Sequence, residues 1–239
     1  MKLTRRLLLL LCLLLAMALA FGAYVSGYYR ADDAARACLA GVGEVRVQDG
    51  NALVALETPG AEDGLIFYPG GLVEPEAYLP LLMRLAERGV DCYLVKMPLN
   101  LAVFGVNRAS EVMAYRPHRR WFLAGHSLGG SMAAFWASLH PGAVKGLILL
   151  AAFPSRKLPE DLQILVLYGS EDGVLSRNWR DKLPPYAVVE ALSGGNHAGF
   201  GCYGAQKGDG VAAVSGEEQQ AWAAGRMLEM IRASDERTS

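Results

Sequence analysis

The sequence predicts a three-layer α/β/α sandwich built on a mostly parallel β-sheet, with no cap domain and with a hydrophobic helix at the N-terminus. Three observations support this fold class. From Gly64 onward, short continuous apolar runs alternate with segments of helical periodicity, which is typical of parallel strands covered on both faces. Two strand-like runs around a turn precede this alternation. At 239 residues, without an internal repeat, the chain fits one such domain with a well-buried core.

The N-terminus carries an export signature. Lys2, Arg5 and Arg6 precede an uncharged apolar run over 7–25. These 19 apolar or small residues just span a bilayer as a helix, and the basic flank favours a cytoplasmic N-terminus with the rest of the chain outside. We therefore favour an uncleaved single-pass membrane anchor over 1–30, with the domain extracytoplasmic.

A cleaved signal peptide is the alternative interpretation of this segment. The small-x-small sites Ala16-Met-Ala18 and Ala18-Leu-Ala20 are typical of signal cleavage, which would leave the domain secreted. A buried core helix is disfavoured, because nothing on the segment is polar enough to face water.

Composition excludes several other classes. With 23 Lys and Arg against 24 Asp and Glu, no nucleic-acid partner is expected. The four cysteines lack C-x-x-C or paired Cys/His spacing, so neither a metal site nor a cofactor is predicted. Export with signal cleavage would leave Cys38, Cys92 and Cys202, an odd number, so at least one thiol is expected to be free or paired between molecules.

Residues 31–44 are expected to form a linker helix that leads into a domain over 45–239. A β-hairpin opens the domain, with strands at 45–48 and 52–57 around Asp49-Gly50-Asn51, residues that suit a tight turn.

The remaining elements follow from apolar periodicity and from proline and glycine stops. Strands are expected at 65–68, 92–97, 121–124, 144–153, 164–168 and 188–192, and helices at 76–88, 109–115, 127–139 and 217–232. The connection between the strands at 144–153 and 164–168 is only about nine residues long.

The stretch Gly125-His-Ser-Leu-Gly-Gly130 falls where the strand over 121–124 meets the next helix. A sharp strand-to-helix turn lifts a serine Oγ clear of the sheet, and glycines on both sides avoid collisions with neighbouring backbone. The helix N-terminus favours the negative charge that develops in acyl transfer. Ser127 is therefore the candidate nucleophile, although the glycines alone also fit an ordinary turn.

A serine hydroxyl needs a histidine base and a group that orients it. His197 lies on the loop after the last strand, from which it can reach over the sheet edge, and it is the candidate base. The other histidines are expected elsewhere: His118 in a solvated loop, His126 inside the turn and pointing away from Ser127, and His140 at a helix end.

Asp172 is the candidate orienting acid. It lies in Gly169-Ser-Glu-Asp-Gly173, directly after a strand and at the same sheet edge as Ser127. Glu171 is the rival carboxylate. The alternative interpretation is that both residues are solvated acids in a turn with no catalytic role.

The oxyanion of a tetrahedral intermediate needs two hydrogen-bond donors. The N–H of Leu128 directly follows the candidate nucleophile. Gly71, in the loop after the strand over 65–68, is the favoured second donor, with Gly70 and Leu72 as alternatives; a simple turn is the other interpretation of that loop.

Together these stretches resemble the α/β-hydrolase superfamily, and most closely its small lid-less branch related to dienelactone hydrolases, the α/β-hydrolase fold-5 family. The resemblance runs from about Gly64 to Gln220 and rests on Phe67-Tyr-Pro-Gly-Gly71, Val95-Lys-Met-Pro-Leu-Asn-Leu-Ala102, Gly125-His-Ser-Leu-Gly-Gly130, Gly169-Ser-Glu-Asp-Gly173 and Gly194-Gly-Asn-His-Ala-Gly-Phe200. It implies Ser127 as nucleophile, Asp172 as acid and His197 as base, in the chain order of that superfamily. Larger relatives often carry a lid after the strand that corresponds to 144–153, and the connection here is too short for one, so the resemblance implies an open site. The resemblance identifies no substrate.

The expected function is a metal-independent serine hydrolase that cleaves a small-molecule carboxylic ester through an acyl-enzyme on Ser127. The loop over 199–210 is expected to wall the site in part, with Gly70, Phe200 and Tyr203 as candidate substrate-binding residues. An acyltransferase with the same three residues, and a non-catalytic membrane-tethered binding module of the same fold, are the alternatives.

Overall fold

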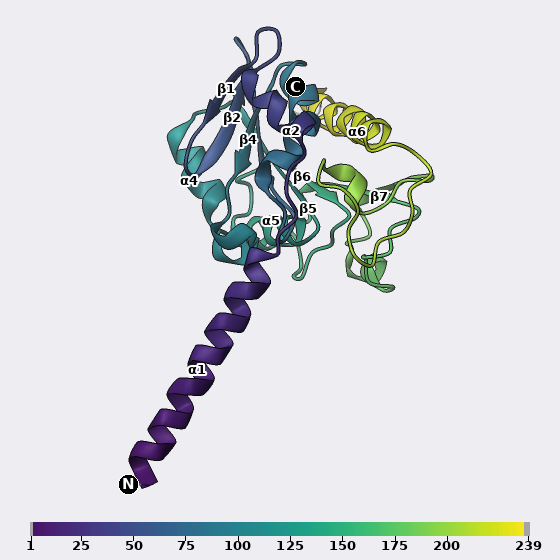
Figure 1. Ribbon diagram of the computed structural model, residues 1–239. Helices are drawn as coiled ribbons and strands as arrows, with labels where there is room; N and C mark the ends of the chain where they lie inside the picture. The colour runs from purple at the N-terminus through teal and green to yellow at the C-terminus, as the bar shows by residue number, and fades with distance from the viewer. Residues whose placement is uncertain (1, 237–239) are drawn as a thin grey trace.

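The computed structural model describes residues 2–236 (Figure 1). The ends of the predicted domain ranges, residue 1 and residues 237–239, lie outside the described residues. Within them, helices cover both faces of one eight-stranded sheet, and a long helix projects away from this body (Figure 1).

The sheet has the strand order β1-β2-β4-β3-β5-β6-β7-β8. A hairpin forms one edge, as predicted: β1 (Arg46–Asp49) runs antiparallel to β2 (Leu53–Glu57), which runs antiparallel to β4 (Val90–Val95). All other pairings are parallel. They involve β3 (Asp63–Tyr68), β5 (Arg120–His126), β6 (Gly146–Leu150), β7 (Gln163–Gly169) and β8 (Val188–Leu192).

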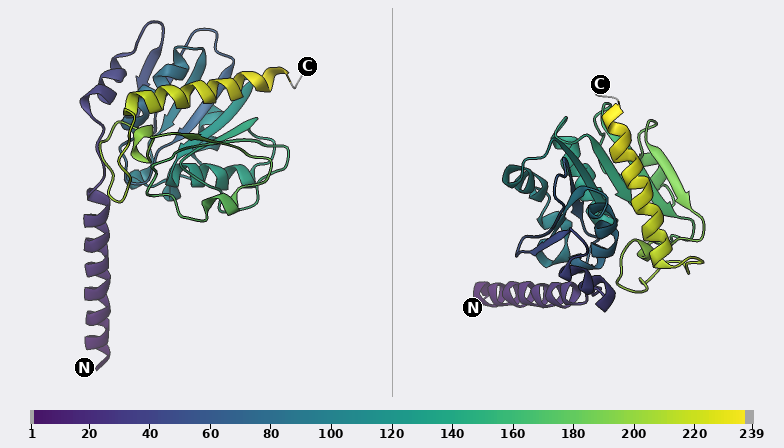
Figure 2. Two further views of the ribbon diagram at one scale, coloured as in Figure 1. Left: turned by 90° about the vertical axis from the view of Figure 1, so that its right-hand side faces the viewer. Right: turned by 90° about the horizontal axis from the view of Figure 1, so that it is seen from above.

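Side chains of each strand alternate between two cores. On β3, Leu65 and Phe67 join one core, while Ile66 and Tyr68 join the other. The first core is covered by α2 (Asp33–Ala37), α3 (Leu79–Ala86) and α6 (Gly216–Glu236), and the second by α4 (Arg108–Tyr115) and α5 (Leu128–Leu139). Figure 2 shows α6, in yellow, lying across one side of the sheet. The predicted three-layer sandwich is confirmed.

Short 3₁₀ helices adjust several predicted boundaries. The helix expected at 76–88 is η2 (Pro75–Tyr78) followed by α3. The strand expected at 144–153 is shorter, because Ala151 has φ 47° and takes the chain off the strand direction. Other single turns are η3 (Pro98–Asn100), η4 (Ala102–Phe104), η5 (Trp179–Lys182) and η6 (Ala198–Phe200).

The six parallel strands end at one edge of the sheet, which we call the carboxyl edge. α5 starts there, directly after β5, and runs back toward the opposite edge. The loops after β3, β5, β7 and β8 therefore meet at the carboxyl edge.

The N-terminal helix α1 (Lys2–Ser26) projects from the body (Figure 1). Its stretch Leu7–Ser26, 20 residues long, is apolar enough to cross a membrane and is 0% buried, the single helix of that kind among residues 2–236. A membrane anchor and a signal sequence share these properties, so both predictions stand.

Residues 31–44 contain two short helices, α2 and η1 (Cys38–Ala40), in place of one linker helix. Asp32 caps α2 by accepting a hydrogen bond from Ala35 N, and Ala35 is fully buried in the first core. This stretch is packed against the domain. All four cysteines are free thiols in the structure.

Candidate active site

Ser127 sits between β5 and α5 at the carboxyl edge. Its φ of 52° and ψ of −123° lie in a sparsely populated region, at a cost on the order of 1–3 kcal/mol. Its N–H donates to Leu150 O at 2.9 Å, and the residue is half-buried. A strained, partly exposed serine at a strand-to-helix turn has the geometry expected of a nucleophile elbow.

Two glycines permit this turn. A Cβ on Gly125 would lie 2.7 Å from backbone atoms of Gly129 and Gly130. A Cβ on Gly129 would lie 2.2 Å from Pro69 O. These neighbours are backbone atoms that cannot move aside, so the collisions predicted from the sequence are confirmed.

Two backbone N–H groups near Ser127 are the candidate oxyanion donors. The N–H of Leu128 belongs to the first turn of α5, where helical partners are missing. In the loop after β3, the N–H of Gly70 donates to a tyrosine hydroxyl at 3.1 Å and that of Leu72 donates to Asn100 O at 2.7 Å. The N–H of Gly71 makes no hydrogen bond within residues 2–236, and a Cβ on Gly71 would lie 2.9 Å from Leu128 Cδ2. Gly71 and Leu128 thus lie side by side, whereas Gly70 and Leu72 are already engaged.

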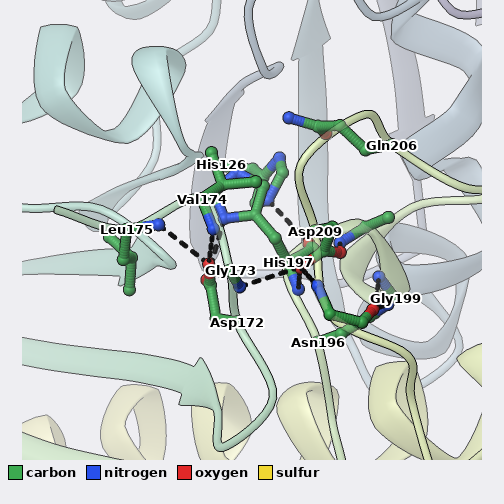
Figure 3. A network of polar contacts seen from close by, with 12 residues as sticks. His126, Asp172, Gly173, Val174, Leu175, Asn196, His197, Gly199, Gln206 and Asp209 are labelled. Carbon is green, nitrogen blue, oxygen red and sulfur yellow. Dashed lines mark hydrogen bonds and ion pairs between the residues drawn. The ribbon is translucent and has the colours of Figure 1, made fainter.

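A buried hydrogen bond joins His197 to Asp172, with 2.8 Å between Nδ1 and Oδ2 (Figure 3). The two side chains are 1% and 2% exposed. The other oxygen of Asp172 accepts from Val174 N at 2.8 Å and Leu175 N at 2.9 Å, which fixes the carboxylate toward the imidazole. The rival Glu171 is exposed and has no contact of this kind.

Because Nδ1–H of His197 donates to Asp172, Nε2 is the acceptor nitrogen of the ring. This nitrogen is buried and has no hydrogen-bond partner in the described part of the chain. The ring packs 4.6 Å from that of His126, the neighbour of Ser127. No hydrogen bond joins Ser127 Oγ to Nε2 in the structure; such bonds commonly tighten only when substrate binds.

Asp209, which sequence reasoning missed, ties the two loops together (Figure 3). Its Oδ1 accepts from His197 N and from Gly173 N, both at 3.1 Å, and its Oδ2 accepts from Ala198 N at 2.8 Å. One carboxylate therefore holds both the loop that carries His197 and the loop that carries Asp172.

Replacing Asp209 with asparagine is expected to lower kcat/KM by roughly 10- to 100-fold, because an amide NH₂ would face a backbone N–H and leave it unpaired, at a cost of about 1–3 kcal/mol. Steady-state kinetics on a soluble ester would measure this. The matched control is Asp161→Asn, an exposed acid remote from the two loops. Equal activity of both variants would contradict the role of Asp209 in holding the two loops.

A second network joins the loop after β3 to the His197 loop. The Tyr78 hydroxyl accepts from Gly70 N at 3.1 Å and donates to His126 Nδ1 at 2.8 Å. His126 Nε2–H then donates to His197 O at 3.1 Å. The pKa of His126 lies well below its ordinary value of 6.5, first because the ring is buried and second because His197 is close. A neutral His126 is required for this pattern.

Acid should therefore weaken the fold through His126. Its folded-state pKa is lower than the unfolded value of 6.5, so the unfolded state binds more protons below that pH. This stabilisation is fully present well above pH 6.5, and below pH 6.5 it falls by up to about 1.4 kcal/mol per pH unit until the folded-state pKa is reached. Denaturant unfolding between about pH 7.5 and pH 5.5 measures the loss of stability, which should be smaller in His126→Gln by about 1.4 kcal/mol over the whole interval. Identical slopes would contradict the assignment.

Some predicted placements differ from the structure. Phe200 and Tyr203 are buried in the first core, with the Phe200 ring 5.8 Å from that of His126, and this packing gives no support to the predicted contact with substrate. The expectation of a solvated His118 is wrong: its side chain is 6% exposed, and its Nε2 lies 2.7 Å from the Tyr93 hydroxyl.

A family profile described as "Alpha/beta hydrolase family" matches residues 64–221, the segment that contains every candidate site residue named above. Similar solved structures include Est1E from Butyrivibrio proteoclasticus, at 16% identity and a TM-score of 0.54, over 80% of this chain and 100% of that chain. MGS-MChE2, an alpha/beta hydrolase enzyme from a lagoon-sediment metagenome of Mar Chica, Morocco, matches at 13% identity and a TM-score of 0.59, over 80% and 99%.

A third similar structure is a membrane phospholipase A described as a bacterial virulence factor, at 16% identity and a TM-score of 0.59. It covers 97% of this chain and 99% of that chain, so the alignment includes most of α1. At such identities the likeness concerns the fold alone. No curated protein matches the chain.

Proposed function

The chain belongs to the alpha/beta hydrolase family, and on that premise we propose that it is a metal-independent serine hydrolase that cleaves carboxylic esters. The observation that carries the proposal is the buried pair of His197 and Asp172, 2.8 Å apart, at the same sheet edge as the strained Ser127. An imidazole held through Nδ1, with Nε2 unpaired, is ready to accept the proton of a hydroxyl.

In this mechanism Ser127 Oγ attacks the ester carbonyl carbon while His197 Nε2 takes its proton. Asp172 stabilises the resulting imidazolium. The N–H groups of Leu128 and Gly71 donate to the oxyanion, helped by the N-terminus of α5. Collapse expels the alcohol, which takes the proton from Nε2 and leaves an acyl-enzyme. A water molecule then attacks the acyl carbonyl carbon and gives a proton to Nε2. Collapse of the second tetrahedral intermediate returns this proton to Ser127 Oγ and releases the acid and free Ser127.

We also propose that α1 is retained as a single-pass anchor with the domain extracytoplasmic; secretion after cleavage is the alternative. At 1.5 Å per residue, the 20 residues of Leu7–Ser26 span about 30 Å, the thickness of a bilayer hydrocarbon core. The likeness to a membrane phospholipase A that extends over α1 supports this position. The intact mass of the membrane-extracted protein tests it, since cleavage after Ala20 would remove the first 20 residues.

A series of chromogenic acyl esters, from acetyl to long-chain, tests the proposed activity on the full-length protein in detergent. Turnover with an initial burst of alcohol, stoichiometric with enzyme, is expected for an acyl-enzyme route. Added alcohol acceptors would divert the acyl group if the protein is an acyltransferase. No turnover of any ester would favour the binding-module alternative.

A further inference from the structure

The chain enters the domain beside the loop that carries Gly71. The N–H of Tyr29 donates to Leu72 O at 2.7 Å, and the N–H of Glu74 donates to Tyr29 O at 2.8 Å, so that Tyr29 forms a parallel bridge with Val73. Leu72 directly follows Gly71. Backbone hydrogen bonds thus hold the entering segment one residue from the proposed oxyanion donor.

Side chains reinforce this attachment. The ring of Tyr29 lies 5.6 Å from that of Tyr203, and its hydroxyl accepts from Lys207 N at 3.1 Å. Two residues later, Ala31 N donates to Glu74 Oε2 at 2.8 Å. The entering segment is therefore a fixed part of the domain and does not behave as a flexible tether.

The distance from α1 to the site is short. α1 ends at Ser26, and three residues of extended chain from there to Tyr29 span at most about 10 Å. The headgroup region on each side of a bilayer is roughly 5–8 Å thick. If α1 spans the hydrocarbon core, Gly71 and its neighbours stand at about the level of the headgroups.

Aromatic and basic side chains mark the same level. Phe21 and Tyr24 are exposed on the last turns of α1, and the guanidinium of Arg30 lies over the ring of Tyr28 at 5.0 Å. Tyrosine and arginine at the end of an apolar helix are typical of a membrane interface. This places the membrane boundary within a few residues of Tyr29.

The surface next to this entry is apolar. The segment of η3 and η4 follows β4, and Leu72 N donates to Asn100 O at 2.7 Å, so the segment borders the same loop as Tyr29 does. Three large side chains there, which we call the rim patch, face solvent: Leu99, Val103 and Phe104, exposed by 51%, 47% and 55%. Clustered exposed apolar groups mark an interaction surface.

We propose that the rim patch inserts into the leaflet that α1 enters and opens the site toward it, so that the substrate is an acyl ester of a membrane lipid. This inference rests on the proposed function and names its substrate class. The reaction adds water across the acyl C–O bond of the lipid and yields a fatty acid and a deacylated lipid. The bilayer, not a second copy of the chain, is the occupant, because the short connection to α1 keeps the rim patch at the membrane at all times.

Full-length protein in vesicles of phosphatidylcholine, phosphatidylethanolamine and phosphatidylglycerol tests this. Fatty-acid release is compared with hydrolysis of a water-soluble acetyl ester. The double variant Val103→Gln/Phe104→Gln is expected to lower release from vesicles by roughly tenfold or more, since two large apolar contacts with lipid are lost. Its soluble-ester rate should stay within about twofold, which also reports an intact fold. The matched control is Leu139→Gln, 47% exposed at the end of α5 away from the carboxyl edge, which should change neither rate.

Three results would overturn the inference while the serine hydrolase stands. In the first, the wild type cleaves the soluble ester but releases no fatty acid from vesicles. In the second, the double variant loses both activities to the same extent, or keeps both. In the third, the wild type is a dimer that the double variant dissociates, while lipid hydrolysis is unchanged. A wild type inert toward both substrates and toward a phosphonate would instead remove the proposed function itself.

Discussion

Replacing Ser127 with alanine is expected to lower kcat/KM for every ester by about four or more orders of magnitude without unfolding the protein. Alanine keeps the Cβ, so the strained backbone at φ 52° is unchanged. Ser127 Oγ makes no hydrogen bond within residues 2–236, so stability should change by less than about 0.5 kcal/mol. Kinetics and thermal unfolding of the same preparation separate the two effects.

Ser131→Ala is the matched control for Ser127→Ala. Ser131 lies on the same helix, and its hydroxyl donates to Phe153 O at 2.8 Å. Its removal should cost about 1 kcal/mol of stability and leave the rate within a few-fold. A Ser127→Ala protein that retains even a tenth of wild-type activity would mean that the reaction uses another nucleophile.

Replacing Asp172 with asparagine is expected to lower kcat by about 10⁴-fold. Oδ1 of Asp172 accepts from Val174 N and Leu175 N, so the amide oxygen of asparagine would stay on that side. Its NH₂ would then face Nδ1 of His197 in place of the carboxylate oxygen now 2.8 Å away. Nδ1 would have to become an acceptor, which moves the ring proton to Nε2, the nitrogen that must take the proton of Ser127.

Glu171→Gln is the control for Asp172→Asn, because Glu171 is adjacent, acidic and exposed. Its rate should match the wild type within about twofold. Loss of activity in Glu171→Gln with retention in Asp172→Asn would reverse the two assignments.

The sheet was predictable because its parallel strands are buried on both faces and appear as continuous apolar runs, such as Leu147 to Leu150. The turn at Ser127 was predictable for a related reason: Gly125 and Gly129 occupy positions where a Cβ would collide with backbone. Features of this kind can be predicted from residues that are close together in the sequence.

Contacts between distant loops were not predictable from such patterns. Asp209 lies in a glycine-rich loop without periodicity, and its partners at Gly173 and His197 come from two other segments. The preference for Gly71 over its neighbours depends on Tyr78 and Asn100, whose bonds occupy the flanking N–H groups. The bridge between Tyr29 and Val73 joins residues far apart in the sequence, so the position of the site near the end of α1 emerged only in three dimensions.

The most direct test of the central claim, that Ser127 is an activated nucleophile oriented by His197 and Asp172, is peptide mass mapping after treatment with a fluorophosphonate. We expect one phosphonyl group on wild-type protein, located on Ser127, and none on Ser127→Ala, with labelling slowed in Asp172→Asn. An unlabelled wild type, or a label on another residue such as Ser131 or Cys202, would contradict the account.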